Sequence, residues 1–401
     1  MKKKLFYILI ILLLPVFSLS AFDWGLLLNQ GTGVLGGNGY DSDFRYSGTL
    51  SPWLFFPKSW GNLYVSLGPE ISYENKSAAL VVDIYRTELA LRIGKAAGIE
   101  LGRMPYTDPM GFVASGLFDG LRYSQNIAGG TLALGVWYTG LLYKKSAQIT
   151  MTEDDYFSYI TKLDYKNFAD TYFSSRRLLF ALDWDNADIL DWLQLRLAFL
   201  GQVDLNGNGN YYHSQYFAIK TNIHVSNFIF DLGFCPQLAQ TPNGIKAGAA
   251  WEAAMGLVPP TPTRDLLKLT GRFSNGTTAD DSEIAAFVPV TTVEQGDVLK
   301  AKLSGLSMLR LDYIIRPLNS LSFNLASSYF ILSDKASYTG LPAGKQGHFL
   351  GNEFSGKVVF IPLSDLRFNL GLGVFLPSWG NADPDAKALW RVELNMTLAI
   401  F

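Results

Sequence analysis

Charged side chains that alternate with apolar ones are the residues of this sequence best placed to do chemistry. In residues 387–401, Arg391 and Glu393 alternate with Trp390 and Val392. A repeat of two places successive side chains on opposite faces of a β-strand, so the charged residues share one face and the apolar residues share the other. Opposed arginine and carboxylate groups on one face order water and select solutes, which is the chemistry of a polar channel wall.

The same alternation recurs in several other segments. A charge that faced lipid near the middle of a bilayer would cost about 2–4 kcal/mol, so we expect the charged faces to line an aqueous lumen. Ion pairing within the wall is the alternative role for any single one of these residues. The predicted pore-lining residues are Arg103, Asp119, Arg122, Arg177, Asp183, Arg196, Asp204, Arg310, Asp312, Glu353, Arg367, Arg391 and Glu393.

Catalytic and metal chemistry have little support in the sequence. His213 and His224 would lie at opposite ends of one strand, about 36 Å apart at 3.3 Å per residue, and His348 has no recognisable nucleophile near it. Cys235 is the only cysteine, which excludes an internal disulfide and a cysteine metal cluster. We therefore predict that the protein is not an enzyme and has no cofactor.

Eighteen strands are predicted by the alternating pattern, and sixteen fit almost as well because the fourth and fifth are ambiguous. Their ranges are 22–30, 44–56, 62–74, 79–93, 97–105, 117–127, 131–144, 174–184, 192–205, 211–224, 226–238, 244–257, 265–274, 303–316, 320–333, 349–361, 365–376 and 387–400. Strand ends predicted in this way are uncertain by two to four residues.

The connections between these strands alternate in length. Those after even-numbered strands are short, whereas those after odd-numbered strands are often long: 31–43, 106–116, 145–173, 275–302, 334–348 and 377–386. Bacterial outer-membrane barrels have short periplasmic turns on one rim and long extracellular loops on the other. The pattern predicts an all-β, antiparallel, up-and-down transmembrane barrel. Residues 145–173 are also rich in aromatic and acidic residues, so we expect them to fold inward or over the mouth, with an exposed lid as the alternative.

Composition agrees with a barrel. The 401 residues are 48% hydrophobic and 17% charged, against about 25% charged in soluble domains. After residue 17, no run approaches the roughly 18 apolar residues of a spanning helix. The formal charge is −2 and no basic block follows residue 4, so nucleic acid is not an expected partner. Tryptophans near strand ends are typical of interfacial aromatic belts.

The two ends of the sequence indicate export and membrane insertion. Lys2 to Lys4 precede the apolar residues 5–17, and small residues follow, which is the pattern of a secretory signal peptide. Cleavage after Ser20 or Ala21 would leave one barrel domain at 21–401, localised in the outer membrane. The last strand ends on the aromatic Phe401, as outer-membrane barrels do, although Phe401 lies out of phase with the apolar face. We expect this strand to engage the barrel-assembly machinery.

Several short motifs resemble those of the alginate-export family of outer-membrane porins. They are Leu101-Gly102-Arg103, Phe118-Asp119-Gly120, a segment with His348, Gly351 and Glu353, and Leu370 to Gly373 followed by Phe375-Leu376-Pro377. Met104 replaces the family's usual Gln, and the His348 segment has one extra residue. The resemblance implies an eighteen-stranded barrel. By their positions in these motifs, Arg103, Asp119 and Arg122, with Glu353, are candidates for the constriction. The alternative is a structural one, in which Asp119 and either Arg103 or Arg122 form a buttress between neighbouring strands.

The predicted function is an outer-membrane porin for passive diffusion of small hydrophilic, sugar-like or anionic solutes. Removal of three lysines would change the charge from −2 to about −5, so alginate itself is not expected. The alternatives are a transporter of hydrophobic compounds resembling the long-chain fatty-acid channel family, or a surface adhesin or antigen. The partners are outer-membrane lipid and the solute. A complete apolar band would suit a monomer.

Overall fold

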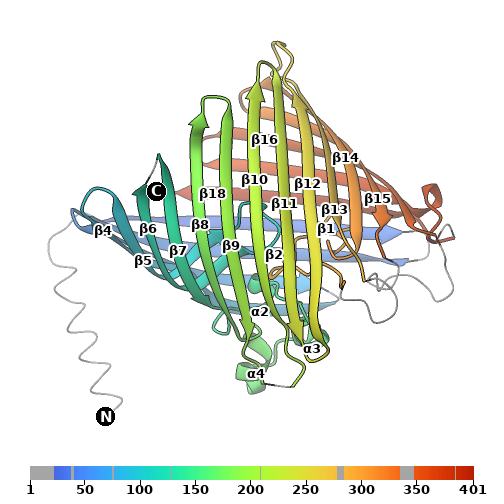
Figure 1. The fold of residues 1–401 in the computed structure, drawn as a ribbon. Coiled ribbons are helices and arrows are strands. Elements are labelled where there is room, and N and C mark those ends of the chain that lie inside the picture. Colours follow the sequence, from blue (N-terminus) through green and yellow to red (C-terminus); the bar gives the residue numbers. More distant parts are fainter. Residues whose placement is uncertain are drawn as a thin grey trace.

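A closed antiparallel β-barrel of eighteen strands forms the protein (Figure 1). The computed structural model describes residues 22–401 except 38–39, 75, 128, 208, 278–283, 335–346 and 384. The predicted signal peptide lies outside the described residues. The strands are β1 (Asp23–Gly37), β2 (Tyr40–Lys58), β3 (Gly61–Glu74), β4 (Ser77–Ile93), β5 (Ala97–Thr107), β6 (Ser115–Ile127), β7 (Gly130–Tyr138), β8 (Arg177–Leu190), β9 (Leu193–Asp204), β10 (His213–Val225), β11 (Phe228–Thr241), β12 (Gly244–Leu257), β13 (Leu266–Ser274), β14 (Leu306–Leu318), β15 (Leu321–Leu332), β16 (Phe349–Leu363), β17 (Leu366–Leu376) and β18 (Leu389–Ile400).

Closure comes from the pairing of β1 with both β2 and β18. The prediction of eighteen strands in an up-and-down barrel is confirmed. Three predicted strand ends are wrong by more than four residues. Strand β1 continues to Gly37 instead of residue 30, so residues 31–43 are mostly strand. The seventh strand ends at Tyr138 instead of residue 144, and the eighth continues to Leu190 instead of residue 184. Within this longer strand β1, Gly36 makes room in the ladder for the indole of Trp390 on β18, which a β-carbon would displace.

The two rims of the barrel differ in their connections. One rim has short turns, and the other carries the long segments 139–176 and 275–305 between strands. The first of these segments contains the short helices α2 (Lys144–Ala147), α3 (Glu153–Ile160), η2 (Tyr165–Asn167) and α4 (Phe168–Tyr172), of which α2, α3 and α4 are labelled at the lower end in Figure 1. A further turn, η3 (Pro377–Trp379), follows β17. Among the described residues, no helix has the length and apolar character needed to cross a membrane.

The outer surface of the barrel is apolar. On β14 and β18, Leu309, Leu311 and Val392 are exposed, whereas the intervening Asp312 and Arg391 are buried. A closed sheet satisfies its own backbone hydrogen bonds, and an apolar exterior can then face lipid. These two properties together suit a barrel that spans a bilayer.

A large apolar core lies within the barrel. Residues from the inner wall, among them Met104 and Trp137, pack against Phe112, Ile149 and Phe287 from three connecting segments. The described parts of these segments, 108–114, 139–176 and 284–305, therefore fold into the lumen. The expectation that the longest loop turns inward agrees with this packing. The interior is consequently divided between a packed region and polar cavities.

Candidate functional site

The β5–β6 hairpin leaves the barrel wall at a glycine. Strand β4 pairs with β5 only from Thr87 to Ile93, and the first part of β4 has β3 as its single ladder partner. Pairing ends at Arg103, directly after Gly102, whose φ of +112° is disfavoured for other residues and whose added β-carbon would collide with the Thr87 carbonyl oxygen. Gly102 faces Gly120 on β6, which is equally crowded by the carbonyl oxygen of Val136. This pair of glycines lets the hairpin turn inward.

The loop at the tip of this hairpin, residues 108–114, crosses the lumen. The buried Asp108 carboxylate fixes its shape by accepting backbone N–H groups of Met110, Gly111, Val113 and Ala114 at 2.8–3.1 Å. The side chain of Met110 occupies the space above Gly233 of β11. The Phe112 ring lies 5.0 Å from the guanidinium carbon of Arg272 on β13. The loop thus links strands that are far apart around the barrel.

Arg103 closes the gap that the hairpin leaves beside β4. Its guanidinium donates to both oxygens of Asp119 at 2.8 and 2.9 Å, to Asp83 on β4 at 3.0 Å, and to the carbonyls of Ile84 and Leu141. Tyr172 of α4 also donates to Asp83, at 3.0 Å. The structure therefore places Arg103 and Asp119 in a buttress between wall and loop, which is the alternative role that the sequence left open.

A second buried arginine attaches the long loop to the other side of the hairpin. Arg177 is fully buried at the start of β8; it contacts Asp155 of α3 and lies 3.3 Å from Asp204 on β9. Asp155 also completes a capping box with Thr152, which fixes the first turn of α3. Arg177 and Asp204 were predicted to line a pore, and in the structure they anchor this helix.

Glu353 has a similar anchoring role on β16. It is fully buried and accepts the backbone N–H groups of Asp297, Val298 and Leu299 at 2.6–2.9 Å. These residues belong to a small hairpin closed by two hydrogen bonds between Gln295 and Ala301, which we call the 295–301 hairpin. Glu353 therefore holds a piece of the 275–305 segment against the inner wall.

Asp297 continues this attachment through its side chain. It accepts hydrogen bonds from Arg310 at 2.9 Å, from Ser355 at 2.7 Å, and from Lys357. Burial alone would raise the pKa of Asp297, but the two cations and the hydrogen bonds outweigh burial and lower it to about 2. Arg310 also pairs with Asp312 on its own strand at 2.9 Å, so these two predicted lumen residues form a network with the loop.

A polar path follows the inner wall beside the 295–301 hairpin. Three adjoining cavities, of about 360, 260 and 410 Å³, share lining residues. Lys300, Arg391 and Glu393 line both the first and the second, and Lys357 lines both the second and the third. The path begins near Glu74 at the loop end of β3 and ends at the short turn between β14 and β15, so it extends from one rim to the other.

Three of the predicted lumen residues, Arg367, Arg391 and Glu393, line this polar path. Sequence reasoning missed Lys300 and Asp297, because docking of a distant loop leaves no local pattern. It also missed Lys357, which the alternation along β16 could have revealed. Lys300 and Arg391 both donate to the Glu393 carboxylate, at 3.1 and 2.9 Å.

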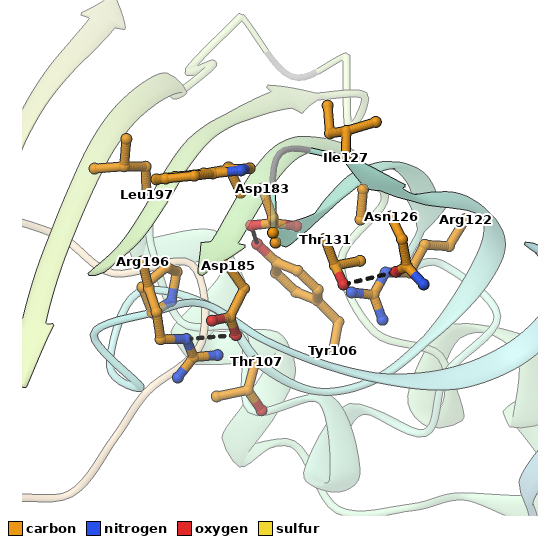
Figure 2. Close-up of a pocket in the computed structure, with 15 residues that line it drawn as sticks. Tyr106, Thr107, Arg122, Asn126, Ile127, Thr131, Asp183, Asp185, Arg196 and Leu197 are labelled. Atoms are coloured by element: carbon orange, nitrogen blue, oxygen red, sulfur yellow. Dashed lines mark hydrogen bonds and ion pairs between the residues drawn. The ribbon is translucent and has the colours of Figure 1, made fainter. Parts of the chain in front are cut away.

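A separate and larger cavity, of about 760 Å³, lies against β5 to β9 (Figure 2). It brings together the predicted residues Arg122, Asp183 and Arg196. Asp183 accepts a hydrogen bond from the Tyr106 hydroxyl at 3.0 Å, and Arg196 pairs with Asp185 at 3.0 Å. We call this cavity the β5–β9 cavity. The structure thus separates the predicted pore residues into anchors, a polar path and this cavity.

The described part of the chain contains no group of three or more His, Cys, Asp or Glu side chains that could hold a metal ion. His213 and His224 lie near opposite ends of β10. Cys235 is buried in the apolar core.

Comparisons with solved structures agree with this architecture. The chain is similar to three outer-membrane proteins of Pseudomonas aeruginosa: OprD (14% identity, 94% of each chain, TM-score 0.62), OccK2 (12% identity, 94% of this chain and 97% of that chain, TM-score 0.63) and OccK1 (10% identity, 94% and 98%, TM-score 0.63). At these identities the likeness shows the fold. No protein-family model and no curated protein matches the chain.

These neighbours refine the resemblance inferred from the motifs. They support a porin-type barrel, but they are OprD and OccK proteins and give no support to the alginate-export family. The Gly102-Arg103 and Asp119-Gly120 motifs have a structural explanation here, because they form the inward bend of the β5–β6 hairpin and the buttress that seals it.

Proposed function

We propose that the protein is an outer-membrane porin through which small hydrophilic solutes diffuse passively. The observation that carries the proposal is the polar path, a series of three adjoining cavities between the two rims, inside a barrel with an apolar exterior. An eighteen-stranded barrel is wide enough for an aqueous channel. The fold likeness to OprD and OccK2 supports the same role.

The charges along the path favour small solutes over a polyanion. Arg391 and Lys300 share the carboxylate of Glu393, and Lys357 pairs with Asp297. Because these three cations are already paired with anions, the part of the path beside the 295–301 hairpin lacks the continuous positive field that a long anionic chain would require. Alginate is therefore not the solute that we propose.

The remaining elements of the proposal concern biogenesis. A signal peptide at residues 1–20 directs export, and residues 21–401 form the barrel. The last strand presents the chain to the barrel-assembly machinery, and the barrel acts as a monomer without catalytic activity. Immunoblotting of outer-membrane fractions and sequencing of the mature N-terminus test these points.

Single-channel recording in planar bilayers tests the function. We expect open conductance steps, and folded, heat-modifiable protein without such steps would contradict the proposal. Lys300→Cys sharpens the test, because a water-soluble charged thiol reagent should then lower the conductance. The wild type should not respond, since Cys235 is buried. Leu311→Cys on the lipid-facing side of β14 is the matched control and should also not respond.

A further inference from the structure

The β5–β9 cavity is placed where a solute would meet the barrel interior from the short-turn rim. Asn126, Thr131 and the glycines of the β6–β7 turn line one end of it. Tyr106, Thr107 and Pro109, which belong to the inward-turned hairpin and its loop, line the other. Its volume of about 760 Å³ is within the range of ligand-binding pockets, roughly 300–1,000 Å³.

The charges in this cavity cancel. Two arginines, Arg122 and Arg196, stand against two aspartates, Asp183 and Asp185. Arg196 pairs with Asp185 at 3.0 Å, and Arg122 lies 3.8 Å from Glu100. A charged solute would have to compete with these internal partners, and the cavity offers it no net field of either sign.

Hydrogen-bonding capacity remains after this pairing. The Oδ2 oxygen of Asp183 and the Nε of Arg122 are buried, and neither has a hydrogen-bond partner among the described residues. The Oδ1 oxygen of Asp183 already accepts the Tyr106 hydroxyl, so the carboxylate is held in place. Both atoms are shielded from water, so they are uncompensated polar atoms in the cavity wall, and the groups open to the cavity include the Asp185 carboxylate and the Arg196 guanidinium.

We infer that the β5–β9 cavity binds a neutral polyhydroxylated solute, a mono- or disaccharide; this rests on the proposed function. Sugar hydroxyls both donate and accept, so they match the paired carboxylates and guanidiniums without disturbing the charge balance. Trp184 also lines the cavity and offers aromatic surface to the apolar C–H face of a sugar ring. Figure 2 shows Asp183, Arg122 and Tyr106 gathered in this space from β8, β6 and β5.

Maltose is the probe for the test. Its binding to the detergent-folded barrel is measured by calorimetry, and maltose-dependent interruption of the current is recorded in bilayers, with glycylglycine and glutamate in parallel. We expect maltose to bind and to interrupt the current. Asp183→Asn with Arg122→Gln should weaken both effects at least tenfold. Lys162→Gln, at an exposed residue after α3 that lines neither this cavity nor the polar path, is the control and should leave them unchanged.

The outcomes distinguish this inference from the proposed function. Conductance steps without any maltose effect would overturn the saccharide site and leave the porin intact. A calorimetric signal for maltose binding that persists in the double variant would also overturn the saccharide site. Stronger interruption by glycylglycine or glutamate than by maltose would show recognition of charge and contradict a neutral ligand. Another outcome is a barrel that shows no conductance steps but binds maltose, with binding lost in the double variant. That result would support the saccharide site and refute the channel.

Discussion

Two regions of the lumen start from similar inward-facing strand positions and are filled in opposite ways. Against β5 to β12, wall residues such as Trp137 and Tyr216 pack on loop residues such as Phe287 in an apolar core. Along β14 to β18 and β1 to β3, a smaller apolar cluster with Phe330 and Phe375 packs with Val298 of the 295–301 hairpin, and charged residues such as Arg391 and Glu393 line cavities. The packed region uses buried apolar surface to hold the loops in place, so the polar region can remain open to water.

The largest loss in the free energy of unfolding should come from breaking the ion pairs that attach the long loop in the packed region. Arg177→Met would leave Asp155 and Asp204 buried without their cation, which typically costs about 3–5 kcal/mol. Guanidinium unfolding of the barrel in detergent micelles should show this loss. Arg367→Met, in the polar region, is the matched control and should change the free energy of unfolding by about 0–1 kcal/mol. Equal losses would contradict the distinction between the two regions.

A substitution at Gly102, where the β5–β6 hairpin turns inward, should give the next largest loss of stability. Gly102→Ala would impose a β-carbon on a residue with φ of +112° and crowd the Thr87 carbonyl oxygen. We expect a loss of about 1–3 kcal/mol and larger current fluctuations, because the hairpin must shift. The unfolding midpoint and the current noise are the measurements. Gly371→Ala on β17, where the nearest atom would be 4.0 Å away, should be neutral or slightly stabilising.

The sequence could predict those features of the two regions that depend on residues close together in the chain. Strand number and the orientation of Arg391 and Glu393 follow from a repeat of two that is visible within a few residues. The Arg103–Asp119 pair was also accessible, because counting outward from both ends of the predicted loop 106–116 places residue 103 opposite residue 119.

Contacts made by the loops were not accessible from the sequence. The partner of Arg177 is Asp155 on a short helix, and the partners of Glu353 are backbone N–H groups of the 295–301 hairpin. No periodicity links these residues, since their meeting depends on where the loops enter the lumen. Sequence reasoning therefore treated buried anchors and lumen residues as one class, and the division of the interior remained unseen.

Selectivity should respond to a substitution in the polar region. Asp297→Asn would remove the anion paired with Lys357, which lines the path, and one of the two anions paired with Arg310, which would keep Asp312. We expect the reversal potential in a salt gradient to shift toward anion preference, with a small loss of stability. Asp154→Asn at the exposed start of α3 removes one negative charge elsewhere and serves as the control. An unchanged reversal potential would mean that ions do not pass beside Asp297.

Acidic pH should act in the same direction as Asp297→Asn, because it protonates the Asp297 carboxylate. Near neutral pH this effect should be the smallest of those predicted here. The pKa of Asp297 is about 2 in the folded protein, below the ordinary value of about 3.9 for an unfolded chain. A lowered pKa contributes stability above the unfolded value and loses it as the pH falls through the folded value. The 295–301 hairpin should therefore stay docked from pH 7 to about pH 4 and loosen between about pH 4 and pH 2. Current noise recorded over this range should rise only in the acidic window, and Asp297→Asn should remove the part of that rise due to Asp297. A variant that kept the full rise would show that another carboxylate controls the hairpin, and Glu353, which binds the same backbone, would be the group to substitute next.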